Sequence, residues 1–224
     1  MGPAGEAALT DFSQLRETMV ERQIAARGIR THAVLQAMRK VPRELFVPDG
    51  MRELAYNDAA LPLGMDQTIS QPYIVALMTE ASLVDGGDRV LDIGTGSGYA
   101  AAVLAEIVGE VYTVERIGEL AREAAIRLAG LGYKNIHMRC GDGTLGWPAH
   151  APFDAIVVAA GGPKIPETLK RQLKVGGRLV IPVGDHALAQ ELVRVTRLSD
   201  AAFQTEDLAN VRFVPLVSDL DVAQ

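Results

Sequence analysis

From Arg89 onward, short runs rich in β-branched residues alternate with segments of helical pattern. The runs are continuously apolar, as is typical of parallel strands that helices cover on both faces. We expect strands in RVLDI, EVYTV, NIHMR, DAIVVAA and RLVIPV, and helices over 98–108, 117–130 and 165–174. This order predicts an α/β fold with an open, doubly wound, mostly parallel sheet.

The two ends of the chain depart from this alternation. Near the N-terminus the apolar spacing predicts a helix over 11–27 that Gly28 ends, and a second helix that Thr31 begins as N-cap. After the fifth predicted strand, ELVRVTR and VRFVPLV both have strand character with no long helix between them. We therefore expect the sheet to finish with antiparallel strands.

The length of 224 residues suits one domain of ordinary α/β size. We expect a flexible tail over 1–10 and a single domain over 11–224. Within it, a helical and loop part over 11–84 would precede a Rossmann-like core over 85–224.

Charge and composition exclude several classes of protein. A formal net charge of -6 argues against a general nucleic-acid binder, which needs a surplus of lysine and arginine. Cys140 is the only cysteine, so no intrachain disulfide can form, and the histidines lack metal-ligand spacing. No apolar run approaches the ~20 residues of a membrane span, and the N-terminus has no signal-peptide pattern. We expect a cytoplasmic monomer without a metal and without membrane or nucleic-acid partners.

The segment VLDIGTGSGY runs from the first predicted strand into the start of a helix. The glycine-rich loop between them has glycines at Gly94, Gly96 and Gly98. Such sheets bind ligands at the carboxyl ends of their strands, where glycine lets the backbone approach a ligand closely. Tyr99 stands where the dinucleotide fingerprint needs Gly or Ala. The carboxylate of Asp92 would repel a pyrophosphate and attract a cation. S-adenosylmethionine, which has an ammonium group, a sulfonium and a ribose, fits this loop better than a dinucleotide.

Acidic residues follow the next two predicted strands. Glu115 ends the second strand, where acids of this fold accept hydrogen bonds from ribose hydroxyls in both kinds of cofactor site. Asp142 and Gly143 follow the third strand, where an acid can accept from an adenine amino group and a glycine leaves room for the ring. Alone, Glu115 would be an ordinary acid at a helix N-terminus and Asp142 part of a turn. Their positions at successive strand ends favour a ligand.

The stretch GMDQTISQPYIVAL, residues 64–77, is more polar than the start of a helix requires. Pro72 suits the first helical turn, and Ser70 or Gln71 immediately before it can act as cap. A single cap leaves Gln67 and Thr68 unexplained.

These segments together resemble the protein-L-isoaspartate O-methyltransferase family. The matching blocks are VPRELFVP, AYNDAALPLGMDQTISQPYIVALMTE, VLDIGTGSGY, VYTVERI, GDGTLGW, APFDAIVVAA, QLKVGGRLVIPVG and RFVPLV. The glycine loop alone indicates only a methyltransferase, whereas the blocks around TISQP and VPRELFVP are much more specific. The resemblance implies a Rossmann-like S-adenosylmethionine-dependent methyltransferase fold with N-terminal helices added. It also implies an exchanged order of the last two strands compared with other methyltransferases.

The resemblance also implies an activity and a site. The reaction would transfer a methyl group from S-adenosylmethionine to the free α-carboxyl of L-isoaspartyl residues in damaged proteins and peptides, leaving S-adenosylhomocysteine. The ester collapses to a succinimide, so the role would be protein repair. Ser70 takes the position of the active-site hydroxyl, and the two ligands meeting there would explain the surplus polarity. The donor would contact Gln67, Thr68, Ile69, Asp92, Gly94, Thr95, Gly96, Ser97, Gly98, Glu115, Arg116, Asp142 and Gly143.

Three positions depart from the family pattern, Tyr73, Ala159 and Val217, which leaves side-chain details of donor contact open. The sequence leaves three alternatives to the repair enzyme. They are a methyltransferase of the same sheet with another acceptor, a nicotinamide-dependent oxidoreductase, and a non-catalytic binding module. The oxidoreductase is disfavoured by Tyr99, and the binding module by intact loops at all the ligand positions.

Overall fold

The central element of the computed structural model, which describes residues 10–185 and 189–218, is a seven-stranded sheet. Its order is β5-β4-β3-β6-β7-β8-β9. The strands are β3 (Arg89–Ile93), β4 (Glu110–Glu115), β5 (Ile136–Cys140), β6 (Phe153–Val158), β7 (Leu173–Val183), β8 (Gln190–Arg197) and β9 (Phe203–Val211). Strands β3 to β7 are parallel, while β8 and β9 pair antiparallel. This confirms the predicted doubly wound sheet with an antiparallel end.

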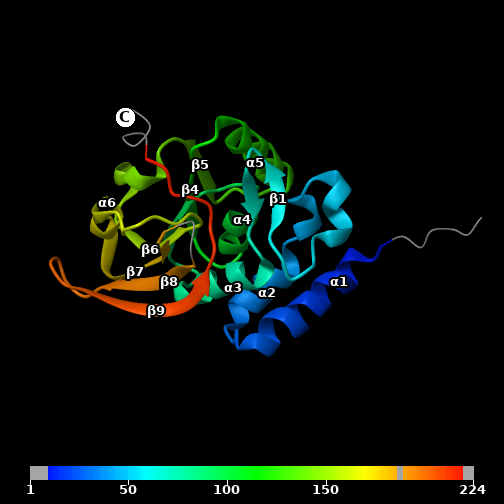
Figure 1. Cartoon of the computed structure of the whole chain (residues 1–224), viewed down its shortest axis with the longest axis horizontal. Helices are drawn as coiled ribbons and strands as arrows, with labels where there is room; N and C mark the ends of the chain where they lie inside the picture. The colour runs from blue at the N-terminus through cyan, green and yellow to red at the C-terminus, as the bar shows by residue number, and fades with distance from the viewer. Residues whose placement is uncertain (1–9, 186–188, 219–224) are drawn as a thin grey trace, which may run out of the picture.

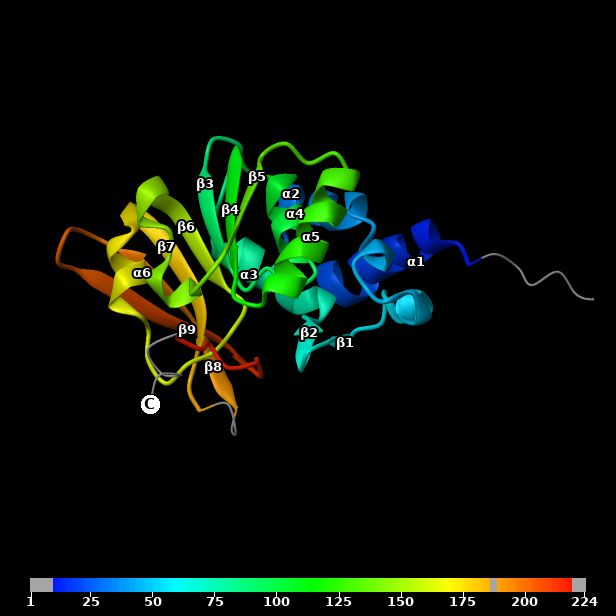
Figure 2. The same ribbon diagram turned by 90° about the horizontal axis from the view of Figure 1, so that it is seen from above.

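Helices cover both faces of the sheet. The helices of this part are α3 (Pro72–Ala81), α4 (Tyr99–Ala105), α5 (Gly118–Gly130) and α6 (Glu167–Arg171). Figure 2 shows α4 and α5 on one side of the strands and α6 on the other. Neighbouring residues of β3 serve both sides, because Val90 joins the core under α4 whereas Leu91 joins the core under α6. Burial on both faces explains why the strands read as continuous apolar runs.

The N-terminal part packs against the α4 side of the sheet (Figure 1). Its helices are α1 (Phe12–Met19), the π-helix η1 (Val20–Ile24), the 3-10 helix η2 (Ala25–Arg27), α2 (His32–Lys40), and the 3-10 helices η3 (Arg43–Leu45) and η4 (Asp49–Leu54). Gly28, at φ +104°, ends the first helical stretch as predicted, and Thr31 is the N-cap of α2, although its side chain makes no capping bond. Met38 and Val103 belong to one hydrophobic cluster, which joins this part to the core.

The polar stretch before α3 forms a hairpin. Strands β1 (Leu61–Gly64) and β2 (Gln67–Ile69) pair antiparallel around Met65 and Asp66, which both have positive φ. Gln71 is the N-cap of α3, but its side chain donates to the backbone carbonyl of Asp58 (3.2 Å). The predicted position of the N-cap is therefore confirmed at Gln71, but the side chain of Gln71 makes no capping hydrogen bond to the helix.

The C-terminal strand differs from the prediction. Strand β9 contains FQTEDLANV, and only Val211 of the predicted VRFVPLV lies in it. A mostly exposed edge strand carries many polar residues, so its sequence lacks the apolar signal of the inner strands. Beyond Val211 the chain leaves the sheet, and Pro215 makes only an isolated bridge to Gly161.

Two short 3-10 helices, η5 (Gly143–Leu145) and η6 (Pro148–His150), follow β5. Among the helices of the described residues, none combines the length and apolar character needed to cross a membrane.

Candidate active site

A cavity, called here the inner cavity, lies at the carboxyl ends of the parallel strands. Its walls are the segment 67–70, the glycine loop after β3, the end of β4, and the C-terminal segment 214–217. Of the residues predicted for the site, those that line it are Gln67, Thr68, Ile69, Ser70, Gly94, Thr95, Gly96, Ser97, Glu115, Arg116 and Gly143. The structure thus brings segments far apart in sequence around one space.

Three of the predicted residues do not line the inner cavity. Asp92 is fully buried in β3. Gly98 is the N-cap of α4, and a Cβ there would lie 3.2 Å from the side chain of Leu128, so this glycine serves helix packing. Asp142 caps η5, where its Oδ1 accepts from the backbone N–H of Thr144 (2.8 Å).

The glycine loop is bent and fixed by Glu115. Gly94, Gly96 and Gly98 all have positive φ, which other residues rarely adopt. The carboxylate of Glu115 accepts from the backbone N–H of Gly96 (2.8 Å) and from that of Ile117 (2.9 Å). Each carboxylate oxygen can accept more than one hydrogen bond, and Glu115 also borders the cavity, so it can still receive hydroxyl groups of a ligand.

A buried hydroxyl chain connects the cavity wall to Asp92. Thr113 donates to Asp92 Oδ2 (2.7 Å), and the hydroxyls of Thr95 and Thr113 are 2.5 Å apart. The other oxygen, Oδ1, has no partner in the described part of the chain. Burial raises the pKa of Asp92 to about 6, with Thr113 lowering it and Glu115 raising it further. A cation bound nearby would stabilise the ionised form, so the site favours a positively charged ligand.

Gly143 has a packing role in addition to the one predicted. A Cβ at this position would lie 2.4 Å from Cγ2 of Ile93, the last residue of β3. The absence of a side chain therefore serves packing against Ile93 as well as leaving space at the cavity wall.

A second cavity, called here the outer cavity, adjoins the first. The two share Thr68, Ser70, Ala159 and Val214. The remaining lining residues are Ala60, Gln71, Ile74, Ala189, Asn210, Val211, Arg212 and Phe213. In the part of the chain that the structure describes, the Ser70 hydroxyl has no protein partner, so it is free to donate to a ligand at the junction.

Sequence reasoning missed most of the C-terminal wall, of which only Val217 was considered. In Figures 1 and 2 this final segment lies close to the β1–β2 hairpin. Gly161 holds it, because its N–H donates to Val214 (2.9 Å) and its carbonyl accepts from Leu216 (2.7 Å). The buried Gln190 accepts from the N–H of Phe213 (2.8 Å).

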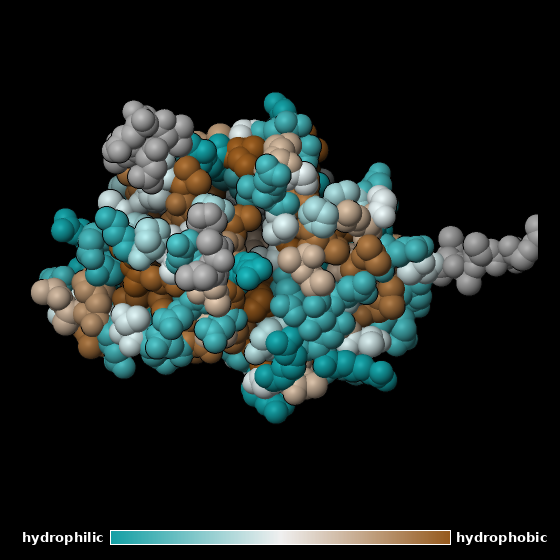
Figure 3. Space-filling view, viewed as in Figure 1, coloured by the Kyte–Doolittle hydropathy of each residue, from teal (hydrophilic) through white to brown (hydrophobic). Residues whose placement is uncertain are grey.

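Figure 3 shows hydrophobic surface between the N-terminal helices and the C-terminal strands.

Within residues 10–185 and 189–218, no group of His, Cys, Asp and Glu side chains is arranged to hold a metal ion.

Comparison with known sequences gives consistent matches. The family model described as protein-L-isoaspartate(D-aspartate) O-methyltransferase (PCMT) matches residues 14–221. A Rhodopseudomonas palustris protein named protein-L-isoaspartate O-methyltransferase is 65% identical over 199 residues, which cover 89% of this chain and 91% of that protein. A Pelobacter propionicus protein named protein-L-isoaspartate O-methyltransferase 2 is 62% identical over 215 residues, which cover 96% of each chain.

Solved structures agree with the sequence matches. A structure named protein-L-isoaspartate O-methyltransferase has a TM-score of 0.82 and 31% identity, covering 92% of this chain and 67% of that chain. A Plasmodium falciparum structure, described as a protein-L-isoaspartate O-methyltransferase in complex with S-adenosyl-L-homocysteine, has a TM-score of 0.78 and 24% identity. It covers 90% of this chain and 98% of that chain, and this second likeness is one of fold.

Proposed function

The chain belongs to the protein-L-isoaspartate(D-aspartate) O-methyltransferase family, and from this premise we propose that it methylates the free α-carboxyl of L-isoaspartyl residues in damaged proteins and peptides. The methyl donor is S-adenosylmethionine, and the product left behind is S-adenosylhomocysteine. One observation carries the proposal: two adjoining cavities share Thr68 and Ser70, as a donor and a peptide that react with each other require.

The inner cavity fits the donor chemically. Glu115 offers carboxylate oxygens to the ribose hydroxyls, and Thr95 and Gly96 lie where the methionine part would bind. Asp92 lies behind the cavity wall and is linked to it by the hydroxyls of Thr113 and Thr95. Its Oδ1, which has no partner among the described residues, favours positive charge nearby. We retain Asp142 as a proposed neighbour of the adenine, although its Oδ1 already accepts from the backbone N–H of Thr144.

The reaction needs no proton transfer by the protein. When bound, S-adenosylmethionine supplies a methyl group on a sulfonium, which is already an activated leaving group. The substrate carboxyl, with a pKa of about 4, is ionised at neutral pH. Methyl transfer forms the bond from carboxylate oxygen to methyl carbon and breaks the bond from methyl carbon to sulfur. The protein contributes orientation, which can supply several of the ~7 to 11 kcal/mol available from holding reactants in line.

Ser70 is the residue that orients the acceptor. Its hydroxyl lies at the junction of the two cavities and donates to the carboxylate oxygen that does not attack. This bond turns the attacking oxygen toward the methyl group, and it also keeps the carboxylate from rotating between equivalent positions.

Several wider expectations join this proposal. The protein acts as a cytoplasmic monomer on isoaspartyl proteins, without nucleic-acid or membrane partners, and residues 11–224 form one domain after a tail over 1–10. A net charge of -6 supports the absence of nucleic-acid binding. Light scattering coupled to size-exclusion chromatography tests the oligomeric state, and a molecular mass of twice 24.0 kDa would contradict it.

A pair of peptides tests the activity. The peptides share one sequence and differ only in containing an L-isoaspartyl or a normal aspartyl residue, and transfer of labelled methyl groups is measured for each. We expect methylation of the isoaspartyl peptide alone, followed by release of methanol as the ester collapses. Equal transfer to both peptides, or transfer to neither, would favour a methyltransferase with another acceptor. Titration with NADH, followed by fluorescence, tests the oxidoreductase alternative, and no binding is expected.

A further inference from the structure

Arg43, in η3, is the largest side chain among the fully buried residues. Arginine is rarely buried completely unless it is paired with an acid. Among the described residues no carboxylate forms an ion pair with Arg43, and the adjacent Glu44 bonds instead to the hydroxyl of Tyr56. Burial lowers the pKa of Arg43, which reflects the unfavourable removal of its charge from water. A residue that is costly to bury calls for a specific role.

The guanidinium of Arg43 holds two backbone carbonyls. Nε donates to the carbonyl of Ala55 (2.7 Å), and Nη2 donates to the carbonyl of Ser70 (2.8 Å). The Ser70 carbonyl precedes α3, which begins at Pro72, so the helix does not satisfy it. Hydrogen bonds that involve a charged donor are stronger than neutral ones. The position of Ser70 therefore depends on a side chain 27 residues before it.

The same guanidinium also contacts Tyr99, another residue that lines the inner cavity. Its Cζ lies 4.7 Å from the centre of the Tyr99 ring, in the arrangement of a cation–π interaction. Tyr99 lines the inner cavity and is the first residue of α4, directly after the glycine loop. The ring is fixed in turn by Phe46, whose centre lies 5.5 Å away. Arg43 thus touches both the segment that carries Ser70 and the helix that follows the glycine loop.

We propose that Arg43 is a positioning residue for methyl transfer, because it sets the position of Ser70 relative to the donor cavity. It touches neither ligand, since it does not line either cavity. It acts through the Ser70 backbone on one side and the Tyr99 ring on the other. Without Arg43, the position of Ser70 relative to the glycine loop would no longer be fixed. Displacement of reacting groups by about 1 Å can lower a rate on the order of 100-fold.

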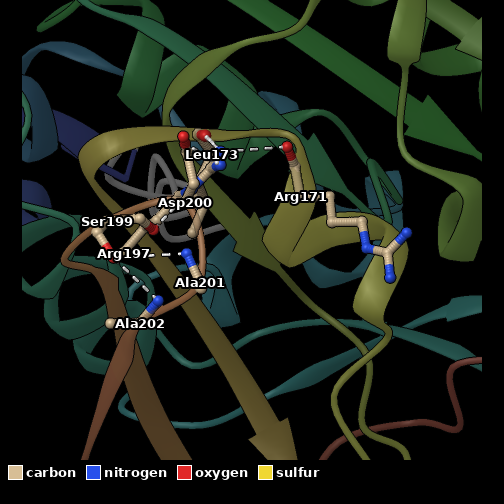
Figure 4. A network of polar contacts seen from close by, with 7 residues as sticks. All are labelled: Arg171, Leu173, Arg197, Ser199, Asp200, Ala201 and Ala202. Atoms are coloured by element: carbon tan, nitrogen blue, oxygen red, sulfur yellow. Dashed lines mark hydrogen bonds and ion pairs between the residues drawn. The ribbon is translucent and has the colours of Figure 1, made fainter.

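Arg197 offers a matched control. It ends β8 and donates from Nη1 to the carbonyls of Leu173 (2.6 Å) and Arg171 (3.4 Å), while Nη2 pairs with Asp200 (2.9 Å), as Figure 4 shows. Leu173 begins β7, at the end of the parallel strands opposite the inner cavity. Both arginines therefore donate to two backbone carbonyls, but only Arg43 does so at the site.

The test compares Arg43→Met, Arg43→Lys and Arg197→Met. Methionine preserves much of the buried volume without hydrogen bonds, and lysine preserves the charge but lacks the planar fork that reaches two carbonyls. For Arg43→Met we expect kcat on an isoaspartyl peptide to fall about 10- to 30-fold, with the KM of the peptide nearly unchanged. The kcat of Arg43→Lys should lie between those of Arg43→Met and the wild type. S-adenosylhomocysteine binding, measured by calorimetry, should change by less than about threefold in both variants, because the donor contacts are retained.

Arg197→Met separates positioning from general stability. It should lower the thermal unfolding temperature and leave kcat at the wild-type value. A similar loss of kcat in Arg197→Met would show that any loosening of the fold slows the reaction, and would overturn the role of Arg43. If Arg43→Met and Arg43→Lys both fail to bind S-adenosylhomocysteine, the residue is needed for the fold itself, which also overturns the proposal.

A double-mutant cycle with Ser70 gives the sharpest readout. If Arg43 acts through Ser70, Arg43→Met in a Ser70→Ala background should lower kcat by less than about threefold further, whereas independent effects would multiply. Multiplied losses would contradict the inference.

The inference rests on the proposed function, and the outcomes are distinguishable: wild-type protein that does not methylate the isoaspartyl peptide refutes the function, whereas active wild type with fully active Arg43→Met refutes only the role of Arg43.

Discussion

The two walls at which the ligands would meet are built in different ways. The glycine loop continues the sheet, because Gly94 donates to the carbonyl of Val114 (2.9 Å) and Glu115 accepts from Gly96. The segment that carries Ser70 lies outside the main sheet, after a two-stranded hairpin. The side chain of Arg43 holds its Ser70 carbonyl, and its own Gln71 side chain donates to the carbonyl of Asp58. The donor site therefore has the rigidity of the sheet, while the acceptor site depends on a few long-range hydrogen bonds. Substitutions should accordingly separate donor binding from turnover.

The largest effect is expected for Glu115→Ala, on the donor side. This change removes the acceptor for the N–H groups of Gly96 and Ile117 and the proposed acceptor for the ribose, so S-adenosylhomocysteine binding should weaken on the order of 100-fold or more. Calorimetry checks the affinity, and Glu115→Gln, which retains one carbonyl oxygen, should lose less. Unchanged affinity in Glu115→Ala would show that Glu115 does not contribute to donor binding.

Ser70→Ala should have the next largest effect, on the acceptor side alone. Loss of one hydrogen bond to a carboxylate should lower kcat on the isoaspartyl peptide about 30-fold, with donor affinity retained. Ser70→Thr keeps a hydroxyl and serves as the control. Wild-type turnover by Ser70→Ala, or a parallel loss of donor binding, would end the distinction between the two walls.

Asp92→Asn should change stability and donor binding in opposite directions. Burial raises the pKa of Asp92 to about 6, so the folded state favours the protonated form. The unfavourable burial of the charge is absent below about pH 4, develops as the pH rises toward 6, and is complete above it. Asparagine removes the charge, so the free energy of unfolding at pH 8 should rise by about 1 to 2 kcal/mol. Little difference should remain at pH 4.

Urea unfolding at both pH values measures the stability, and calorimetry should show donor affinity lowered only about threefold to tenfold, because Asp92 does not line the cavity. A variant that is less stable at pH 8 than wild type would contradict the assigned burial of an ionised carboxylate.

Removing residues 1–10 should have the smallest effect. Of these, residues 1–9 lie outside the described part of the chain, and Asp11 remains to cap α1 by accepting from Ser13 (3.0 Å) and Gln14 (3.2 Å). We expect kcat/KM and the unfolding temperature to match those of the full chain. A clear loss of either would assign the tail a role in the fold or the site.

Sequence alone predicted the features that repeat or that follow local rules. Burial on both faces gives a parallel strand a continuous apolar run, so β3, β4 and β6 could be predicted from pattern. Glycine at positive φ and an acid at a strand end have local causes, so the glycine loop and Glu115 could be predicted as parts of a ligand site. The edge strand β9 escaped prediction because an exposed strand needs no apolar face.

How separate segments meet depends on the packing of the folded chain. It buried Asp92 completely, assigned Gly143 to packing against Ile93, and placed residues 214–217 on the cavity wall. It also joined Arg43 to the carbonyl of Ser70. Hydrophobic periodicity records whether a residue is buried within its own strand or helix. It does not record which distant backbone group a buried side chain will reach, because that contact is set by the packing of whole elements against one another.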